Sequence, residues 1–141
     1  MACNYSPGKF YRRDRLCIER AIKNRRAKHK LVKDLLEYIG VIHVHTTASD
    51  GSGGIKDVVR AARDSKVDFV IITDHDTLEH KERGNEGWHG NVLVLVGEEI
   101  SPKKNHYMAF GIDKEIHANG KCPDDYIREV ERQGGIGFIV H

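Results

Sequence analysis

The sequence predicts an α/β protein with a parallel sheet, and three observations support this fold class. Residues 40–46 and 67–73 are apolar, β-branched runs typical of strands, and residues 57–65 between them have helical composition. The second run, VDFVIIT, is apolar throughout, as in strands buried on both faces. A strand, a helix and a strand in this order form a βαβ unit, which joins two parallel strands by a right-handed crossover. Polar residues that can bind metals also follow successive strands.

The first predicted strand carries two histidines at spacing two. Successive residues of a strand point to opposite faces, so His43 and His45 project from the same side of the sheet. Asp50 follows in a Ser-Asp-Gly-Ser-Gly-Gly turn, whose flexible backbone can return the carboxylate to the strand end. Two imidazoles and a carboxylate form a ligand set that suits zinc, manganese or iron. For either histidine alone, a hydrogen-bonded place in the core is the alternative interpretation.

The next two strands also end in polar groups. Strand 67–73 runs into Thr73-Asp74-His75-Asp76-Thr77, and strand 91–96 runs into Gly97-Glu98-Glu99-Ile100-Ser101. Residues 78–90 between them are predicted to be helical or irregular. Because the carboxyl ends of parallel strands meet at one edge of an α/β sheet, we expect these groups to lie close to the two histidines.

The last third of the chain continues this pattern. A predicted fourth strand over 106–112 begins with His106, a helix over 124–133 ends before two glycines, and a fifth strand over 136–140 is followed by His141. Ligand-type residues at so many strand ends favour a common metal site over coincidence. The remaining histidines have no such position and are expected on the surface; they are His29, His80, His89 and His117.

Composition places the chain among small soluble proteins. Its 141 residues suffice for one domain, and 39% apolar and 31% charged residues are typical of globular proteins. No apolar run is long enough to span a membrane, and the N-terminus lacks the apolar core of a secretion signal. The three cysteines are far apart and odd in number, which argues against a disulfide framework and predicts a cytoplasmic protein.

Charge divides the chain into an N-terminal basic helical segment, residues 1–39, and a domain over residues 40–141. Residues 9–37 hold eleven Lys and Arg against four Asp and Glu, and residues 9–38 are predicted to form one long or two shorter helices. The basic residues could contact nucleic acid. We favour the interpretation that they are the solvated face of an amphipathic helix, because apolar residues recur among them.

Residues 40–141 resemble the PHP family, the polymerase and histidinol phosphatase domain. The four motifs that carry this resemblance, in order, are His43-x-His45 with Ser49-Asp50-Gly51; Thr73-Asp74-His75-Asp76-Thr77; Gly97-Glu98-Glu99-Ile100-Ser101 followed by His106; and Gly134-Gly135-Ile136 leading to His141. Four ordered motifs are far more specific than a single His-x-His. HTTASDG and TDHDT are similar to stand-alone phosphoesterases, and VGEEIS followed by HYMAFGI is similar to carbaryl-hydrolase-like metallohydrolases.

The resemblance implies a distorted (β/α)7 barrel, of which this chain forms part, with two or three manganese, iron or zinc ions at the strand ends. It implies these metal ligands, transferred position by position: His43, His45, Asp50, His75, Glu99, His106 and His141. Glu99 would bridge two ions, and Asp50, His75 and Glu99 would also take part in catalysis. Glu98 would line the pocket or contact a ligand residue. Asp74 or Asp76 would orient a ligand imidazole by accepting its other N–H.

The implied function is hydrolysis of a phosphate ester of a small metabolite or nucleotide, by in-line attack of a metal-bound hydroxide on phosphorus. Two alternatives stay open. One is hydrolysis of a carbamate or other ester at the same site, and the other is an inactive metal-binding remnant or a basic module that binds nucleic acid. Family members carry a late Asp-x-His motif, and the sequence ends before it, so we expect a fragment of a longer protein. The oligomeric state is left open.

Overall fold

The computed structural model describes residues 36–140. By its contacts the chain divides into two units, Met1–Glu37 and Tyr38–His141, close to the boundary that the charge pattern predicts. The predicted N-terminal helices, up to residue 35, and the predicted ligand His141 lie outside the described residues. All described strands and helices belong to the second unit.

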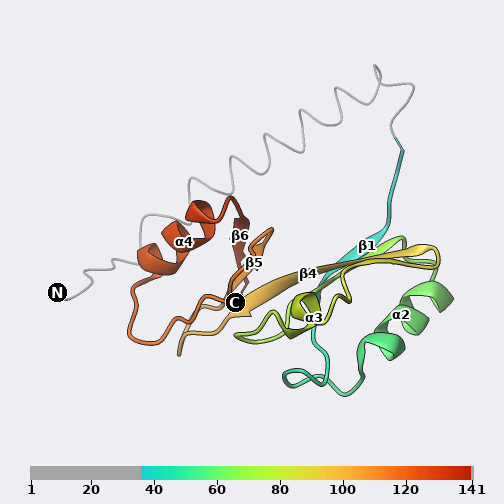
Figure 1. Ribbon diagram of the computed structural model, residues 1–141, viewed down its shortest axis with the longest axis horizontal. Helices are drawn as coiled ribbons and strands as arrows, with labels where there is room; N and C mark the ends of the chain where they lie inside the picture. Colours follow the sequence, from blue (N-terminus) through green and yellow to red (C-terminus); the bar gives the residue numbers. More distant parts are fainter. Residues whose placement is uncertain (1–35, 141) are drawn as a thin grey trace. The chain divides into compact units, whose positions relative to one another are not determined.

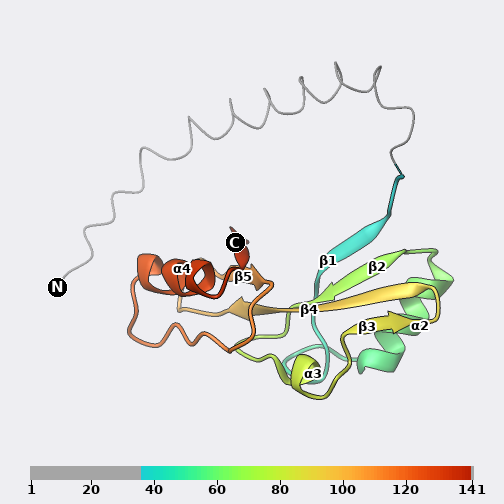
Figure 2. The same ribbon diagram turned by 45° about the horizontal axis from the view of Figure 1, so that its top comes forward.

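Within the described residues, one six-stranded sheet is accompanied by three helices. In chain order the elements are β1 (Gly40–Val44), α2 (Ile55–Asp64), β2 (Phe69–Ile72), α3 (Glu79–Glu82), β3 (Gly87–His89), β4 (Val92–Ile100), β5 (Tyr107–Phe110), α4 (Pro123–Arg132) and β6 (Ile136–Ile139). The strand order is β1-β2-β4-β5-β6, and β3 pairs with β4 outside this path. The sheet curls into a half barrel, with the long β4 running through both of its halves (Figure 1 and Figure 2).

The first half of the sheet is parallel, as the βαβ pattern predicts. β1 pairs with β2 and β2 pairs with β4, both in parallel. α2 forms the crossover between β1 and β2, and apolar side chains of the helix and of the sheet form a cluster between them. The helix begins after Gly54, whose N–H donates to the Asp57 carboxylate at 3.0 Å. This crossover brings the carboxyl ends of β1 and β2 to the same edge.

The second half of the sheet is antiparallel, so the predicted parallel sheet is wrong there. β4 is longer than predicted, continues through Glu98 and Glu99 to Ile100, and pairs antiparallel with β5, which pairs antiparallel with β6. Only residues 101–106 join β4 to β5, and so short a chain can reverse direction but cannot cross back to begin a parallel strand. The reversal still puts the start of β5, and His106, beside the end of β4.

The uncertain segment over 78–90 contains the short helix α3 and the strand β3. β3 pairs antiparallel with the first part of β4, and β5 pairs with the last part. A strand of three residues is too short to give an alternating pattern, and for this reason the sequence did not predict it.

Two apolar clusters form the core, one in each half of the sheet. The first lies between α2 and the parallel strands, and the second joins β4 and β5 to α4 and to the segment that holds Ile112 and Ile116. The outer strands keep large apolar side chains exposed, namely Val41, Ile42, Ile136, Phe138 and Ile139. Among the described residues, the half barrel is therefore open along both outer strands.

Composition predicts that no segment spans a membrane and that the cysteines form no disulfide framework. None of the helices among residues 36–140 has the length and apolar character that a membrane crossing requires. Cys122 is disulfide-bonded, whereas the cysteine spacing argues against a disulfide framework. Position in sequence does not report which cysteines meet in space, and proximity is what permits a disulfide.

Candidate metal centre

The two histidines of the first strand meet Glu99 at the edge of the sheet. His43 lies on β1 and His45 directly follows it, and their rings lie on the same side with centroids 4.9 Å apart. The Nε2 atoms of the two rings are 2.9 Å apart, and they lie 2.8 Å and 2.9 Å from Oε2 of Glu99. Three potential ligand atoms thus form a triangle that one cation could contact at once.

Asp50 reaches this edge because the loop after β1 folds back on itself. The carbonyl of Thr46 accepts hydrogen bonds from the N–H groups of Ser49 and Gly51. A Cβ on Gly51 would lie 2.3 Å from the carbonyl oxygen of His45, so this close approach requires glycine. Oδ1 of Asp50 lies 3.2 Å from Nδ1 of His45. The loop therefore places a carboxylate, with 69% of its side chain exposed, at the solvent side of the cluster.

His75 and His106 complete the surroundings of Glu99. His75 follows β2 and forms a parallel bridge with Glu99, and its Nδ1 lies 3.6 Å from Oε2 of Glu99. Nε2 of His75 lies 3.6 Å from Oδ2 of Asp50. Nδ1 of His106 lies 2.8 Å from Oε1 of Glu99. Four imidazoles from three separate segments therefore surround one buried carboxylate.

The structure brings together six of the seven predicted ligand residues, and the seventh, His141, lies outside the described residues. They form three overlapping groups whose ligand atoms lie within 4.8 Å of one another, and these groups are His43, His45 and Glu99; His45, Asp50 and His75; and His75, Glu99 and His106. Imidazole nitrogens and carboxylate oxygens are suitable ligands for zinc, manganese and iron. Because the groups share residues, they are neighbouring positions of one centre. The donor set fits divalent cations, whose identity and number it does not fix.

The electrostatics of Glu99 favour its charged form. Burial raises the pKa of the Glu99 carboxyl, but the hydrogen bonds with His43 and His106 and the charges of His43 and His75 lower it, and the net result is a pKa below the usual value. A carboxylate that keeps its charge in a buried place is a strong ligand for a cation.

Besides Asp50, the side chains of Ser49 and Ser101, and not those of Asp74 and Asp76, contact the imidazoles of His45 and His75. Nδ1 of His75 lies 2.6 Å from Oγ of Ser101, and the Ser101 hydroxyl donates to the carbonyl of Glu99. Since its only proton is used there, Ser101 accepts the Nδ1–H of His75, which leaves Nε2 of His75 unprotonated and able to bind a cation. Oγ of Ser49 lies 3.4 Å from Nδ1 of His45.

The contacts described for Asp74 and Asp76 are with other groups than the imidazole of a predicted ligand, although the sequence predicts that one of them accepts the N–H of such an imidazole. The carboxylate of Asp76 accepts the backbone N–H of Ser101 at 3.0 Å. The carboxylate of Asp74 accepts the hydroxyl of Ser49 at 2.6 Å and the backbone N–H of Thr46 at 2.7 Å. Neighbours in sequence on a short extended segment point in different directions, and the serines of the adjacent segments occupy the space beside the rings.

His80 is buried, although the sequence predicts a surface position. Its Nε2 lies 2.7 Å from Oγ1 of Thr46, whose hydroxyl donates to Asp74, and its Nδ1 lies 3.1 Å from the side-chain amide of Asn85. The buried residues Thr46, Asp74 and His80 thus form a polar network behind the loop that carries Asp50. Nothing in the sequence around His80 signals this role, because its partners come from distant segments.

Glu98 does not belong to the cluster around Glu99. It points to the opposite face of β4, where both carboxylate oxygens face the backbone N–H of Ile116 at 2.9 Å and 3.2 Å. Burial raises its pKa to about 8; the hydrogen bond from Ile116 lowers it in part, and the charges of Asp76 and Glu115 raise it further. The expectation that Glu98 lines the site is therefore wrong, since alternation along the strand turns its side chain away.

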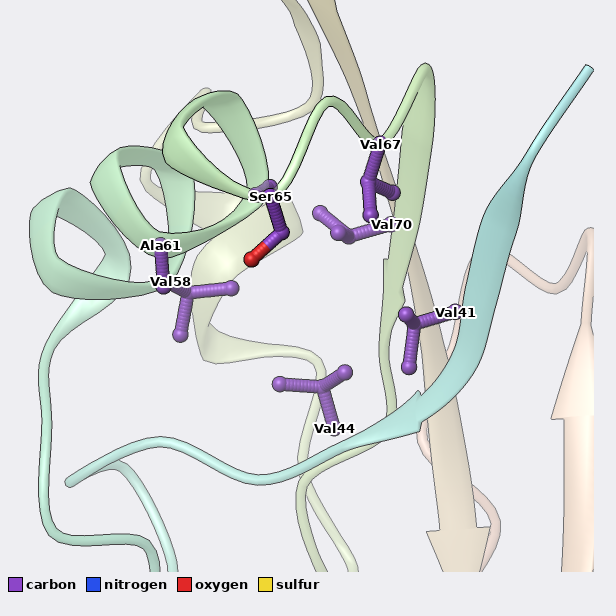
Figure 3. Close-up of a pocket in the computed structure, with 8 residues that line it drawn as sticks. Val41, Val44, Val58, Ala61, Ser65, Val67 and Val70 are labelled. Atoms are coloured by element: carbon purple, nitrogen blue, oxygen red, sulfur yellow. The ribbon is translucent and has the colours of Figure 1, made fainter.

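An apolar pocket of about 300 Å³ lies apart from this cluster, between α2 and the strands β1 and β2. Figure 3 shows valine and alanine side chains around it, and Ser65 is the one polar residue of its lining. Without converging polar groups, it offers no reactive chemistry, and the candidate site is the cluster around Glu99.

In comparisons with known proteins, no family model matches the chain and no curated protein matches it significantly.

Proposed function

We propose that this chain is the metal-binding part of a hydrolase of the PHP type, most simply a phosphoesterase that acts on a small phosphorylated metabolite or nucleotide. The observation that carries the proposal is the position of Glu99, a buried carboxylate with four imidazoles from three segments around its oxygens. The order of the four motifs and the curled sheet are in keeping with part of a PHP barrel.

In this proposal, the ligands are His43, His45, Asp50, His75, Glu99 and His106, with His141 as a further candidate. They would hold two or three divalent ions, of manganese, iron or zinc. When bound, such ions lower the pKa of a water molecule from about 15.7 toward about 7 and offset charge on phosphoryl oxygens. The protein residues would hold the ligands in place. Ser101 keeps the proton of His75 on Nδ1, and the turn closed by the carbonyl of Thr46 brings Asp50 to the cluster.

Metal content tests the proposal directly. The full chain is depleted of metal with a chelator and dialysed against Mn²⁺, and bound metal is counted per chain. We expect two or three ions in the unchanged protein, and the loss of at least one in His43→Ala and in Glu99→Gln. His89→Ala, a histidine outside the cluster, is the matched control and should keep the full content. Unchanged content in both ligand variants would refute the proposed centre.

Turnover then separates the possible reactions. The Mn²⁺-loaded protein should hydrolyse p-nitrophenyl phosphate, and Glu99→Gln should lower this rate at least about 100-fold, because even the partners behind metal ligands contribute about 10- to 100-fold. Turnover of a naphthyl carbamate in place of the phosphate ester would assign the site to carbamate hydrolysis. Bound metal without either reaction would indicate a binding function.

A further inference from the structure

A second group of ligand-type side chains lies on the other face of β4. A carboxylate oxygen of Asp76, one of Glu98 and an imidazole nitrogen of His117 lie within 4.8 Å of one another. We call Asp76, Glu98 and His117 the outer group. They come from the segment after β2, from β4 and from the segment between β5 and α4.

The outer group is separate from the cluster around Glu99. Glu98 and Glu99 follow one another on β4, and their side chains leave the strand on opposite faces. The backbone fixes this division, because the N–H of Glu99 donates to the carbonyl of Asp74 and the N–H of Asp76 donates to the carbonyl of Glu99. None of the three residues belongs to the three groups that surround Glu99. A cation bound to the outer group would therefore occupy a different position.

Glu98 has little protein compensation for a buried carboxylate. Its side chain is fully buried, and the hydrogen bonds described for it come from one backbone N–H, that of Ile116. Two further carboxylates, Asp76 and Glu115, lie near enough to repel its charge, and Lys121 is the cation that attracts it. Taking an ionised carboxylate out of water costs several kcal/mol unless a cation or several hydrogen bonds compensate it. The place has the carboxylate and imidazole ligand atoms that suit a metal cation.

His117 exposes the outer group to solvent. Its side chain is 57% exposed, while Glu98 beneath it is fully buried. The order from solvent to core is thus an exposed imidazole, a partly buried Asp76 and a buried Glu98. One imidazole and two carboxylates form a ligand set found in divalent metal sites, and three protein ligands leave room for water.

We propose that Asp76, Glu98 and His117 bind a divalent cation at a site distinct from the centre around Glu99. The cation would compensate the buried charge of Glu98 and tie together three segments that are distant in sequence. Because the Asp76 carboxylate also accepts the N–H of Ser101, the site would stabilise the segment that orients His75. This inference does not depend on the proposed hydrolase function.

Equilibrium dialysis of the full chain against Zn²⁺ tests the outer site. We expect His117→Ala to bind one Zn²⁺ fewer than the unchanged protein, and the exposed position of His117 makes a folding defect from this change small. Glu98→Gln should lose the same single ion, and the double variant should lose no more than either. Asn119→Ala, an exposed residue of the same segment, is the matched control and should keep the full number.

The same measurement in Glu99→Gln separates the two sites. If the outer site is independent, His117→Ala removes one further Zn²⁺ from the Glu99→Gln protein as well. Failure of the centre around Glu99 would show as unchanged binding in Glu99→Gln alone, without any effect on the outer site. Equal Zn²⁺ content and affinity in the unchanged protein and in His117→Ala would overturn the proposal, and so would a loss that disappears in the Glu99→Gln background.

Discussion

Glu98 and Glu99 are adjacent on β4 and equally buried, yet their surroundings shift their pKa values in opposite directions. Burial raises the pKa of both carboxyls. On the face of β4 that carries Glu99, which we call the inner face, the imidazoles of His43 and His106 outweigh the effect of burial. They hold the pKa of Glu99 below its usual value. On the opposite face of β4, the outer face that carries Glu98, the hydrogen bond from the N–H of Ile116 offsets the effect of burial only in part. The pKa of Glu98 therefore rises to about 8. Burial alone therefore does not set the charge of a carboxyl group, because the partner that lies within hydrogen-bonding distance decides it.

The largest expected effect concerns the stability of the metal-free protein between acid and alkaline pH. The pKa of Glu98 is about 4.5 in the unfolded chain and about 8 in the folded one. Across this window the folded protein binds one more proton than the unfolded chain, so its free energy of unfolding falls as pH rises from about 4.5 to about 8. A shift of this size corresponds to several kcal/mol, at about 1.4 kcal/mol per pKa unit.

Urea denaturation of the metal-free protein at pH 5 and at pH 8.5 measures this effect. Gln at position 98 cannot ionise, so Glu98→Gln should remove most of the fall in stability and should be the more stable protein at pH 8.5. Glu86→Gln, which removes a carboxylate from the segment between α3 and β3, controls for the loss of a negative charge. Parallel pH profiles of the Glu98→Gln protein and the unchanged protein would contradict the assigned environment of Glu98.

An intermediate effect is expected at Ser101, whose hydroxyl contacts the imidazole of His75. Ser101→Ala removes the acceptor of the Nδ1–H of His75, so that His75 can protonate at Nε2 and turn away from the cluster. We expect Mn²⁺ affinity to fall by about 10- to 100-fold, as for other partners of ligand histidines. The measurement is a Mn²⁺ titration of the metal-depleted protein.

Two further variants distinguish positioning by Ser101 from a general structural role. Ser101→Thr keeps the hydroxyl and should restore most of the affinity, and Ser65→Ala, a serine at the end of α2, should bind Mn²⁺ normally. A Ser101→Ala protein with unchanged affinity, or a Ser101→Thr protein as weak as Ser101→Ala, would show that the tautomer of His75 is set by other groups.

The smallest effect is expected at Glu129, a partly exposed carboxylate that pairs with an exposed arginine. Arg132 donates to Glu129 at 2.6 Å and 2.8 Å on the surface of α4 and lowers the pKa of Glu129 to about 2. The stabilisation by this pair is present above pH 4.5 and is lost as pH falls from there to about 2. Because solvent screens exposed charges, Glu129→Gln should lower Tm only slightly at pH 7 and not at pH 2. Thermal melts beside Glu131→Gln measure the difference, and a large fall in Tm at pH 7 would show that this pair contributes more than an exposed ion pair normally does.

Much of the cluster around Glu99 could be predicted from the sequence, because its ligands lie at strand ends and in a turn that short sequence patterns identify. The alternation in β1 predicts that His43 and His45 share a face, and the βαβ unit predicts that His75 arrives at the same edge. The glycine-rich turn after β1 predicts that Asp50 folds back, and Gly51 allows the close approach that this requires. These inferences need only neighbours within a strand, a turn or one crossover.

The outer face and the serine contacts could not be predicted in this way. Ser101 lies beside His75, and His117 lies beside Glu98, only because segments separated by many residues pack together. The antiparallel course of β5 and β6 has the same origin, since the direction of each strand depends on the partner that it meets. The burial of His80 depends likewise on Thr46 and Asp74 in other segments.

By itself, the sequence determined the parallel half of the sheet and the gathering of histidines and carboxylates at its edge, because periodicity and short connections fix which face and which end a residue occupies. Only the tertiary structure decided which side chain stands next to which. That choice gives Glu99 its imidazoles, leaves Glu98 with one backbone N–H and places a serine behind each of two ligand rings. The physical reason is that hydrogen bonds and charge interactions act over a few ångströms in space, whatever the distance along the chain.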